Sequence, residues 1–197
     1  MKKEKPKNEI DIKYYDNGQK KEEVHFKNGK IDGKWTSWDE NGCKKSEVNY
    51  KDDKLNGKST KWYESGRKKS EEYFKDNLPD HHNCIYWNEN GQKELERTEL
   101  ERTNIGGFRD YKETLWYDNG QKKLEVSYKG GYPDGKETNW YENGQIEQEI
   151  NWKKGGMDGK WTEWYESGNK KSETNYKDDR AQGKSTSWHV NGQKSLE

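Results

Sequence analysis

The sequence predicts an all-β fold, an elongated single-layer antiparallel sheet of about eight consecutive β-hairpins with a 24-residue repeat. The first observation is a glycine that recurs at steps of 24, 24, 25, 29, 24, 24 and 24 residues, at Gly18, Gly42, Gly66, Gly91, Gly120, Gly144, Gly168 and Gly192. The second is an aromatic residue four positions before each glycine, at Tyr14, Trp38, Trp62, Trp87, Trp116, Trp140, Trp164 and Trp188. A fixed period of this length is typical of repeat proteins.

Composition indicates a thin structure. Hydrophobic residues make up 25% of the chain and aromatic residues 13%, which leaves too few aliphatic side chains for a thick two-layer core. The strict period argues against disorder, so aromatic ladders and main-chain pairing are expected to hold the fold. The chain has 38 basic and 38 acidic residues, so no excess of charge points to nucleic acid or to an anionic membrane.

The sequence predicts a flexible charged tail at residues 1–9. It predicts a single repeat domain at residues 10–197, with an irregular section at 78–111. No run of 18 or more apolar residues occurs, so no transmembrane helix is expected. The first residues lack the apolar segment of a secretion signal. A cytoplasmic location is therefore expected, although a mature secreted form with its leader removed would look the same. Cys43 and Cys84 are interpreted as incidental thiols.

Each repeat is expected to contain two strands and two turns. In the unit at 57–74, Thr60 and Trp62 alternate with Ser59 and Lys61, which is typical of a half-buried strand. The Asn-Gly or Ser-Gly step then supplies the positive φ of a tight hairpin. The spacing favours a three-residue loop, which would place Thr60, Trp62 and Phe74 on one face. A second turn, such as the one at 52–54, completes the repeat.

A glutamate flanked by lysines recurs five residues after the turn glycine, at Glu23, Glu47, Glu71, Glu96, Glu125, Glu149 and Glu173. Opposite charges on neighbouring strands stabilise a sheet by about 0.2–1 kcal/mol per pair. We therefore expect charge ladders on a solvated face and not an active site.

The section at 78–111 departs from the period. His82 and Tyr111 stand where the second turn of other repeats has a glycine, and the sequence of 94–98 is duplicated at 99–103. An insertion of five residues, an odd number, would reverse the faces of a strand. It must therefore be absorbed as a bulge or a longer loop.

The chain resembles a known repeat family. Residues 50–58 resemble the Tyr/Trp-x-x-Gly-Lys-x-x-Gly core of MORN repeats, and residues 11–197 resemble the MORN-repeat variant, Gly-Lys-x-x-x-Trp-Tyr-x-Asn-Gly-x-x-x-x-Glu-x-x-Tyr. The resemblance implies an elongated sheet of hairpins and, for bacterial proteins of this kind, an antitoxin or immunity component that neutralises a toxin by binding it. Other MORN proteins are associated with membranes and scaffolds. The second glycine of their Gly-x-Gly core is replaced here, by Trp35, Ser59, Glu137 and Trp161.

No catalytic, cofactor or metal site is predicted, and the chain is not expected to be an enzyme. The stretch Asp80-His81-His82-Asn83-Cys84 is the one cluster that resembles a metal site. Zinc requires four ligands, usually in two spaced pairs, and no second pair is evident. A degenerate turn is the favoured interpretation of this stretch, and a Cys84–His82 catalytic pair has no evident orienting partner.

The tryptophan column at 38, 62, 87, 116, 140, 164 and 188 allows two interpretations. The rings either stack on one another as a structural ladder or form an exposed binding stripe, since aromatic residues dominate interface hot spots. The opposite face varies between repeats, and variation on a regular scaffold is how repeat proteins individualise binding surfaces. The partner-binding candidates are Trp35, Lys61, Tyr86, Leu115, Trp161, Glu94, Arg97, Glu99 and Arg102.

The expected function is binding of one specific protein partner, a toxin, nuclease or other effector, by an antitoxin-like or immunity-like inhibitor that acts through steric coverage. Direct binding of nucleic acid is not expected. The alternative is a structural scaffold or surface repeat protein that self-associates or docks on membranes or glycans. The sequence leaves the oligomeric state open.

Overall fold

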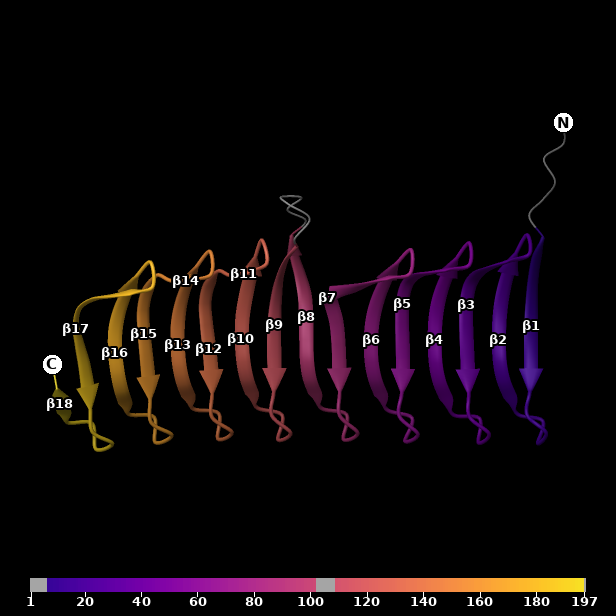
Figure 1. Cartoon of the computed structure of the whole chain (residues 1–197). Coiled ribbons are helices and arrows are strands. Elements are labelled where there is room, and N and C mark those ends of the chain that lie inside the picture. The colour runs from indigo at the N-terminus through magenta and orange to yellow at the C-terminus, as the bar shows by residue number, and fades with distance from the viewer. Residues whose placement is uncertain (1–6, 102–108, 197) are drawn as a thin grey trace. The chain divides into compact units, whose positions relative to one another are not determined.

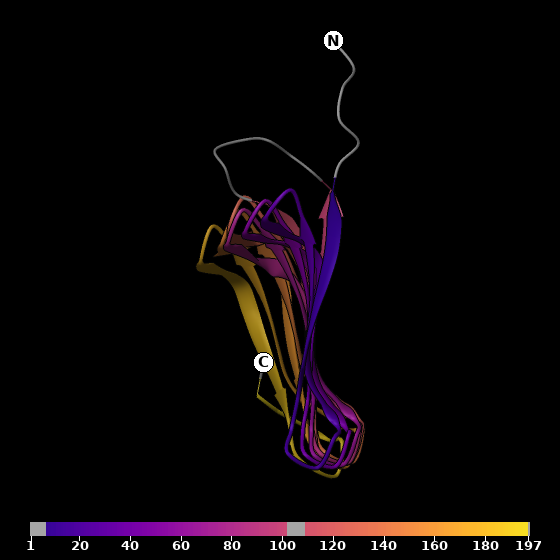
Figure 2. The ribbon, with the colours of Figure 1, turned by 90° about the vertical axis from the view of Figure 1, so that its right-hand side faces the viewer.

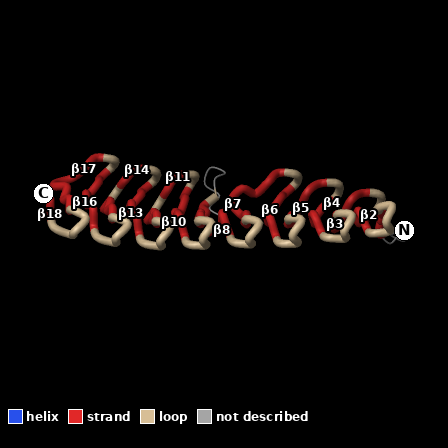
Figure 3. Tube along the Cα trace, turned by 90° about the horizontal axis from the view of Figure 1, so that it is seen from below, coloured by secondary structure: helices blue, strands red, loops and turns tan. Residues whose placement is uncertain are grey.

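The computed structural model describes residues 7–101 and 109–196, and these contain only strands and turns (Figure 3). The chain folds as two compact units, Met1–Gln92 and Lys93–Glu197. Arg102, one of the binding candidates, lies outside the described residues. The all-β fold of consecutive antiparallel hairpins is confirmed, and the strands of each unit form one layer (Figures 1 and 2).

In the first unit each strand pairs antiparallel with the next. Its strands are β1 Asn8–Tyr14, β2 Lys20–Lys27, β3 Lys30–Trp38, β4 Lys44–Lys51, β5 Lys54–Trp62, β6 Lys68–Lys75 and β7 Leu78–Trp87.

The second unit continues the same pattern, with two of its strands divided into a short and a long part. Its strands are β8 Lys93–Glu101, β9 Asp110–Trp116, β10 Lys122–Lys129, β11 Tyr132–Pro133, β12 Gly135–Trp140, β13 Ile146–Lys153, β14 Gly156–Met157, β15 Gly159–Trp164, β16 Lys170–Lys177, β17 Arg180–Trp188 and β18 Lys194–Leu196.

The Asn-Gly turns are three-residue loops, as the spacing predicts. In the turn between β12 and β13, the Gly144 amide donates to the Tyr141 carbonyl (2.9 Å) and the Tyr141 amide donates to the Gln145 carbonyl (2.9 Å). Gly144 has φ 84°, a left-handed conformation that glycine adopts without a steric penalty. This is a type I turn followed by a glycine bulge, a common hairpin connection.

A second irregularity follows each of these turns. Trp62 pairs with Lys68, but Lys61 pairs with Ser70, so Lys69 is an extra residue in β6. The bulge shifts the register by one, and Thr60 consequently pairs with Glu71. Phe74 pairs with Gly57 and lies on the face opposite Trp62. The expectation that Phe74 shares a face with Thr60 and Trp62 is therefore wrong, because the loop alone does not determine the parity.

The turns at the other edge of each sheet, apart from the β8–β9 connection, are two-residue loops. Asp52 and Asp53 both have positive φ, 48° and 65°, as a type I′ turn requires. Asp53 also bonds to the preceding hairpin, since its amide donates to the Ile31 carbonyl (2.9 Å) and its Oδ1 accepts from the Ile31 amide (2.7 Å). These bonds hold a non-glycine residue in an otherwise unfavourable conformation.

Neighbouring repeats are also joined at the Asn-Gly edge. The Tyr141 hydroxyl donates to the carbonyl of Trp164 (2.9 Å), 23 residues further along the chain. The same bond joins Tyr15 to Trp38, Tyr63 to Trp87, Tyr117 to Trp140 and Tyr165 to Trp188. The tyrosine after each tryptophan thus fixes the distance between successive turns.

The core consists of small side chains under longer ones. Among the described residues, no side chain has less than 2% of its surface exposed. Most of the buried positions are small or aliphatic, at Thr36, Ser59, Thr60, Ser70, Thr114, Thr162, Val24, Cys84, Val126 and Ile150, and the others are the acidic residues Glu71, Asp110 and Glu113. Lysine, glutamate and aromatic side chains cover them, as their long apolar stems allow.

The duplicated section lengthens one hairpin. Strand β8 pairs with β9 in regular register from Leu95–Leu115 to Glu99–Tyr111, and the register shifts between Glu99 and Glu101. The second copy of the duplication thus begins at the register shift, and residues 102–108 lie outside the described chain. Tyr111, which replaces a glycine, stacks on Tyr128 with ring centroids 4.6 Å apart.

We expect Tyr141→Phe to lower the free energy of unfolding by about 1 kcal/mol, because it removes one hydrogen bond between neighbouring turns and leaves the ring in place. Urea unfolding followed by tryptophan fluorescence measures this. Tyr132→Phe is the matched control, since Tyr132 is 62% exposed. Equal stability of the two variants would contradict the structural role of the tyrosine hydroxyl.

Candidate functional site

Each unit presents two chemically different faces. The tryptophan face carries the tryptophan column, the glutamate column and the buried threonines, because the bulge after each turn brings all three to one side. The variable face is the opposite side. It carries the binding candidates Trp35, Lys61, Tyr86, Leu115, Trp161, Arg97 and Glu99.

On the tryptophan face a lysine lies over each indole ring with one exception. The Lys44 ammonium lies 5.2 Å from the ring centroid of Trp62, and Lys122 lies 5.6 Å from that of Trp140. Lys20, Lys68, Lys93 and Lys170 cover Trp38, Trp87, Trp116 and Trp188 in the same way. The exception is Trp164. The residue of the preceding repeat at the lysine position, which pairs with Trp140, is Ile146. Six of the seven tryptophans of the column, all half-buried, are thus part of a lysine–aromatic ladder.

The same lysines bind the glutamate column. Glu71 accepts from Lys58 (2.7 Å) and from Lys68 (2.6 Å). Glu47, Glu125 and Glu173 each bind two lysines in the equivalent way. The predicted charge ladder on this face is therefore present, and its glutamates form ion pairs within the sheet.

Burial acts to raise the pKa of the Glu71 carboxyl, but the hydrogen bonds and charges of Lys58 and Lys68 outweigh it and hold the pKa below its ordinary value. The pKa of Glu47 and that of Glu125 are lowered by the same balance. At Glu173 the hydrogen bonds from Lys160 and Lys170 are the larger effect, and they lower its pKa. These carboxylates are stabilised in their charged form by folding.

Lysine exceeds glutamate on the tryptophan face. Three lysine columns lie there for one glutamate column. In the first unit the third column, at Lys27, Lys51 and Lys75, has no ion pair among the described residues, whereas Lys177 of the same column pairs with Asp158 (2.6 Å). The equal numbers of acidic and basic residues in the whole sequence therefore do not describe this surface. The tryptophan face is basic although the whole chain has no net charge.

The variable face carries an apolar stripe near the type I′ turns. Each aromatic of one strand pairs with an apolar residue of the next, as in Phe26–Ile31, Tyr50–Leu55, Phe74–Pro79, Tyr128–Pro133, Trp152–Met157 and Tyr176–Ala181. Trp35 and Trp161 extend it, with ring centroids 5.8 Å from those of Tyr50 and Tyr176. The apolar partners were not identified from the sequence, although most of them stand two residues before the glycine that ends the second turn, as Ile31 stands before Gly33.

Beyond this stripe the variable face changes from repeat to repeat. Lys61 is exposed, Tyr86 donates to Glu72 (2.5 Å), and Leu115 pairs with Leu95 and Leu124. No column rule relates these side chains, in contrast to the tryptophan face. The variation predicted from the sequence therefore lies on one face.

A charged cluster occupies the variable face beside the duplication. The Arg97 Nε donates to Glu113 Oε2 (2.6 Å), and the guanidinium lies 5.8 Å from the ring centroid of Tyr111. Arg109 approaches Glu99 at 3.4 Å. Burial is the main reason that the pKa of Tyr111 is raised above its ordinary value. Glu94, the remaining described candidate of this section, is exposed.

The histidine-rich stretch is a bulge of β7. Cys84 pairs with Glu72 and Asp80 pairs with Tyr73, so β7 contains three more residues than β6 at this point, 81–83. The His82 amide donates to Asp80 Oδ1 (3.2 Å) and Cys84 is buried. The residues that the structure describes include no group of three or more His, Cys, Asp or Glu side chains placed to hold one metal ion. Both cysteines are free thiols.

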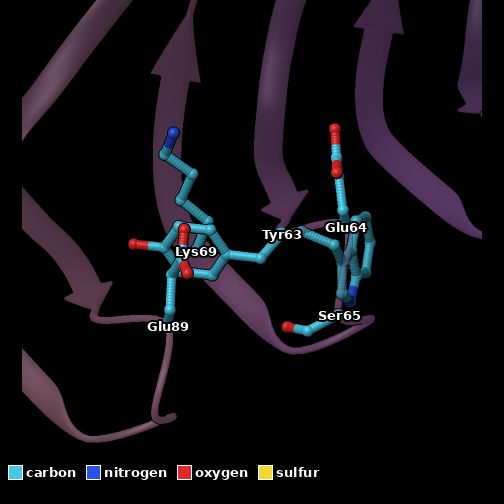
Figure 4. Close-up of a pocket in the computed structure, with 6 residues that line it drawn as sticks. Tyr63, Glu64, Ser65, Lys69 and Glu89 are labelled. Atoms are coloured by element: carbon cyan, nitrogen blue, oxygen red, sulfur yellow. The ribbon is translucent and has the colours of Figure 1, made fainter.

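Surface pockets recur between neighbouring turns. One of about 340 Å³ is lined by Trp62, Tyr63, Glu64, Ser65, Lys69 and Glu89 (Figure 4). The Tyr63 ring points toward the turn that carries Glu89, and Lys69 lies 5.3 Å from its centroid. A pocket of about 370 Å³ has the equivalent residues Tyr15, Lys21 and Glu40. These hollows are thus a property of the repeat and carry no residue specific to one site.

Comparison with known proteins agrees with this geometry. The family model described as MORN repeat variant matches residues 12–28, 31–52, 55–76, 110–129, 133–154 and 157–178. These matches cover more than half of the chain, and the chain therefore belongs to the MORN-repeat variant family. Proteins built from such repeats are generally modules that bind proteins or membranes. The matches leave out residues 77–109, which include the histidine-rich bulge and the duplication.

No curated protein matches the chain. Among solved structures, the chain is similar to one described as "Crystal Structure of TcdB2-TccC3", with 12% sequence identity and a TM-score of 0.29. The similarity covers 92% of this chain and 13% of that chain. The described residues contain no helix that is long and apolar enough to cross a membrane.

We expect the fold to lose stability as the pH falls below about 4.5, the ordinary value for a glutamate. A carboxyl whose pKa is lowered by folding contributes stability in full above its unfolded value and loses that contribution as the pH falls through the folded value. Glu71→Gln should therefore be less stable than the parent at neutral pH and should lose less stability on acidification.

Urea unfolding at a series of pH values checks this. Glu64→Gln, at an exposed turn position, is the control and should follow the parent. Parallel pH profiles for the parent and Glu71→Gln would contradict the proposed lysine–glutamate ladder.

Proposed function

We propose that this chain is a non-enzymatic protein-binding module, an antitoxin-type or immunity-type inhibitor that neutralises one protein partner by covering it with the variable face. The observation that supports this is the contrast between the two faces. One face repeats a lysine, glutamate and tryptophan pattern, and the other changes from repeat to repeat outside its apolar stripe. Such a division is how repeat proteins combine a common scaffold with individual specificity.

The chemistry of the variable face fits a protein partner. Half-buried aromatic rings form a stripe, with Trp35, Tyr50, Trp161 and Tyr176 among them. Tryptophan, tyrosine and arginine are the residues that contribute most to protein interfaces. Lys61 and the cluster around Arg97 add charged groups that would select one partner over another.

The proposed role requires no catalysis, because steric coverage of an active surface is enough to neutralise a partner. We place the protein in the cytoplasm, a reducing compartment in which free thiols such as Cys43 and Cys84 are the normal state. The proposed partner is a toxin, a nuclease or another effector protein.

The test uses the same substitution on opposite faces of each unit. In the first unit, Lys61→Glu changes the variable face and Lys51→Glu changes the tryptophan face. In the second unit, Asn139→Lys and Asn175→Lys form the equivalent pair. Affinity capture from host lysate, with mass spectrometry, is followed by reconstitution of the purified partner and by assay of the partner's own activity.

We expect one stoichiometric partner whose activity is inhibited, and a loss of affinity of about tenfold or more with Lys61→Glu or Asn139→Lys. The two tryptophan-face variants should bind as the parent does. Loss of binding only in the tryptophan-face variants would refute the proposed interface, as would a captured protein whose activity is unchanged.

The basic tryptophan face favours a second candidate function, docking of a scaffold on an anionic membrane surface. Lys27, Lys51 and Lys75 lie two strands apart, about 10 Å by strand spacing. Lysines near an acidic lipid surface each contribute about 1 kcal/mol to binding. Sedimentation with vesicles of acidic lipid tests this.

The membrane candidate predicts that Lys51→Glu weakens vesicle binding about fivefold while Lys61→Glu retains it, the reverse of the outcome for the protein partner. Neutral vesicles are the control. Binding that is independent of the lipid charge would contradict the candidate.

A further inference from the structure

The asparagine of the three-residue turns is held in some repeats and free in others. In the turn at 141–145, the Asn143 Oδ1 accepts from the Gln145 amide (2.9 Å), and its Nδ2 donates to the Glu166 carbonyl (3.0 Å). The first bond closes the turn and the second reaches the next repeat. Asn17 and Asn119 make the same pair of bonds.

Two turns use a different residue for the first of these bonds. Where five of the other turns have tyrosine and the last has His189, these have Asp39 and Asn88. The Asp39 Oδ1 accepts from the amides of Asn41 (2.9 Å) and Cys43 (2.8 Å). The Asn88 Oδ1 likewise accepts from the amides of Asn90 (3.1 Å) and Gln92 (3.0 Å).

The side-chain carboxamides of Asn41 and Asn90 consequently make no hydrogen bond with any residue that the structure describes. Both residues are exposed, and both precede a glycine, Gly42 and Gly91. The carboxamides are therefore free to rotate toward the amide nitrogen of that glycine.

From this difference we propose that Asn41 and Asn90 are sites of spontaneous deamidation, which converts them to aspartate and isoaspartate. The Gly42 nitrogen attacks Cγ of Asn41 and loses its proton as the new C–N bond forms. The Cγ–Nδ2 bond breaks, and Nδ2 leaves with that proton as ammonia, which closes a five-membered succinimide. Water then opens the ring at either carbonyl, giving aspartate or isoaspartate. No oxidant, cofactor or enzyme is required.

The turn itself promotes this reaction wherever the asparagine is free. Glycine has no Cβ, so its nitrogen is the least hindered nucleophile in a chain. The glycine amide is held equally in both kinds of turn, by Asp39 in one (3.0 Å) and by Tyr141 in the other (2.9 Å), so it does not distinguish them. The two kinds of turn differ in the hydrogen bonds of the asparagine carboxamide. Where these hydrogen bonds are present, they must break before the glycine nitrogen attacks, which should slow deamidation about tenfold.

The product would alter the turn edge of the first unit. Deamidation adds a carboxylate next to Asp39 and Glu40, and the isoaspartate form lengthens the main chain by one methylene between β3 and β4. The left-handed Gly42, with φ 83°, closes this turn. Asn41 and Asn90 thus mark two repeats whose turns can be changed after synthesis, independently of the proposed partner.

The test is a time course of the whole chain at mildly alkaline pH, with peptide mapping by mass spectrometry. We expect Asn41 and Asn90 to convert about tenfold faster than Asn17, Asn119 and Asn143. In urea all five sites should convert at similar rates, because they share the Asn-Gly sequence. Equal rates in the folded chain would overturn the proposal.

Two exchanges of the controlling residue keep the proposal falsifiable. Asp39→Tyr should slow conversion at Asn41 about tenfold, and Tyr141→Asp should accelerate it at Asn143 by a similar factor. The unaltered turns of each variant serve as internal controls for folding. An unchanged Asn41 rate in a folded Asp39→Tyr variant would refute the role of the turn's first residue.

Discussion

One extra residue after each Asn-Gly turn determines which side chains share a face. Without the bulge at Lys69, Thr60 would pair with Ser70, and Glu71 would lie away from Trp62. With it, tryptophan, glutamate and threonine lie together, and the lysines that flank the glutamate reach both its carboxylate and the indole ring of the following repeat. The ladders of this face therefore depend on the bulge.

A single-layer sheet must also protect its own two faces. Here the buried layer is made of small side chains, such as Thr60, Thr162 and Val126, and the long side chains of lysine, glutamate and the aromatics lie over them. Hydrogen bonds between the turns also hold neighbouring repeats together. Tyrosine hydroxyls make them at one edge of the sheet and aspartate side chains at the other. Such a fold needs few aliphatic residues because each repeat is held by its neighbours.

This division leaves the variable face free to differ. The tryptophan face has a structural task in every repeat, and changes there would break ion pairs that the neighbouring strands share. The variable face keeps only an apolar stripe in common and carries Lys61, Tyr86 and Leu115 without a repeated pattern. The same logic explains the turns, where Asp39 and Asn88 replace tyrosine and release the asparagine two residues later.

The sequence by itself determined the repeat, the hairpins and the family, because a 24-residue period of turn glycines and aromatics permits few other arrangements. It also placed Trp35, Lys61, Tyr86, Leu115 and Trp161 opposite the tryptophans, since alternation along one strand is a local property. Only the tertiary structure decided the side of Phe74, the ring contacts of the lysines and the apolar column that includes Ile31. These depend on the register between strands, and a bulge of one residue changes that register without leaving a distinct signal in the sequence.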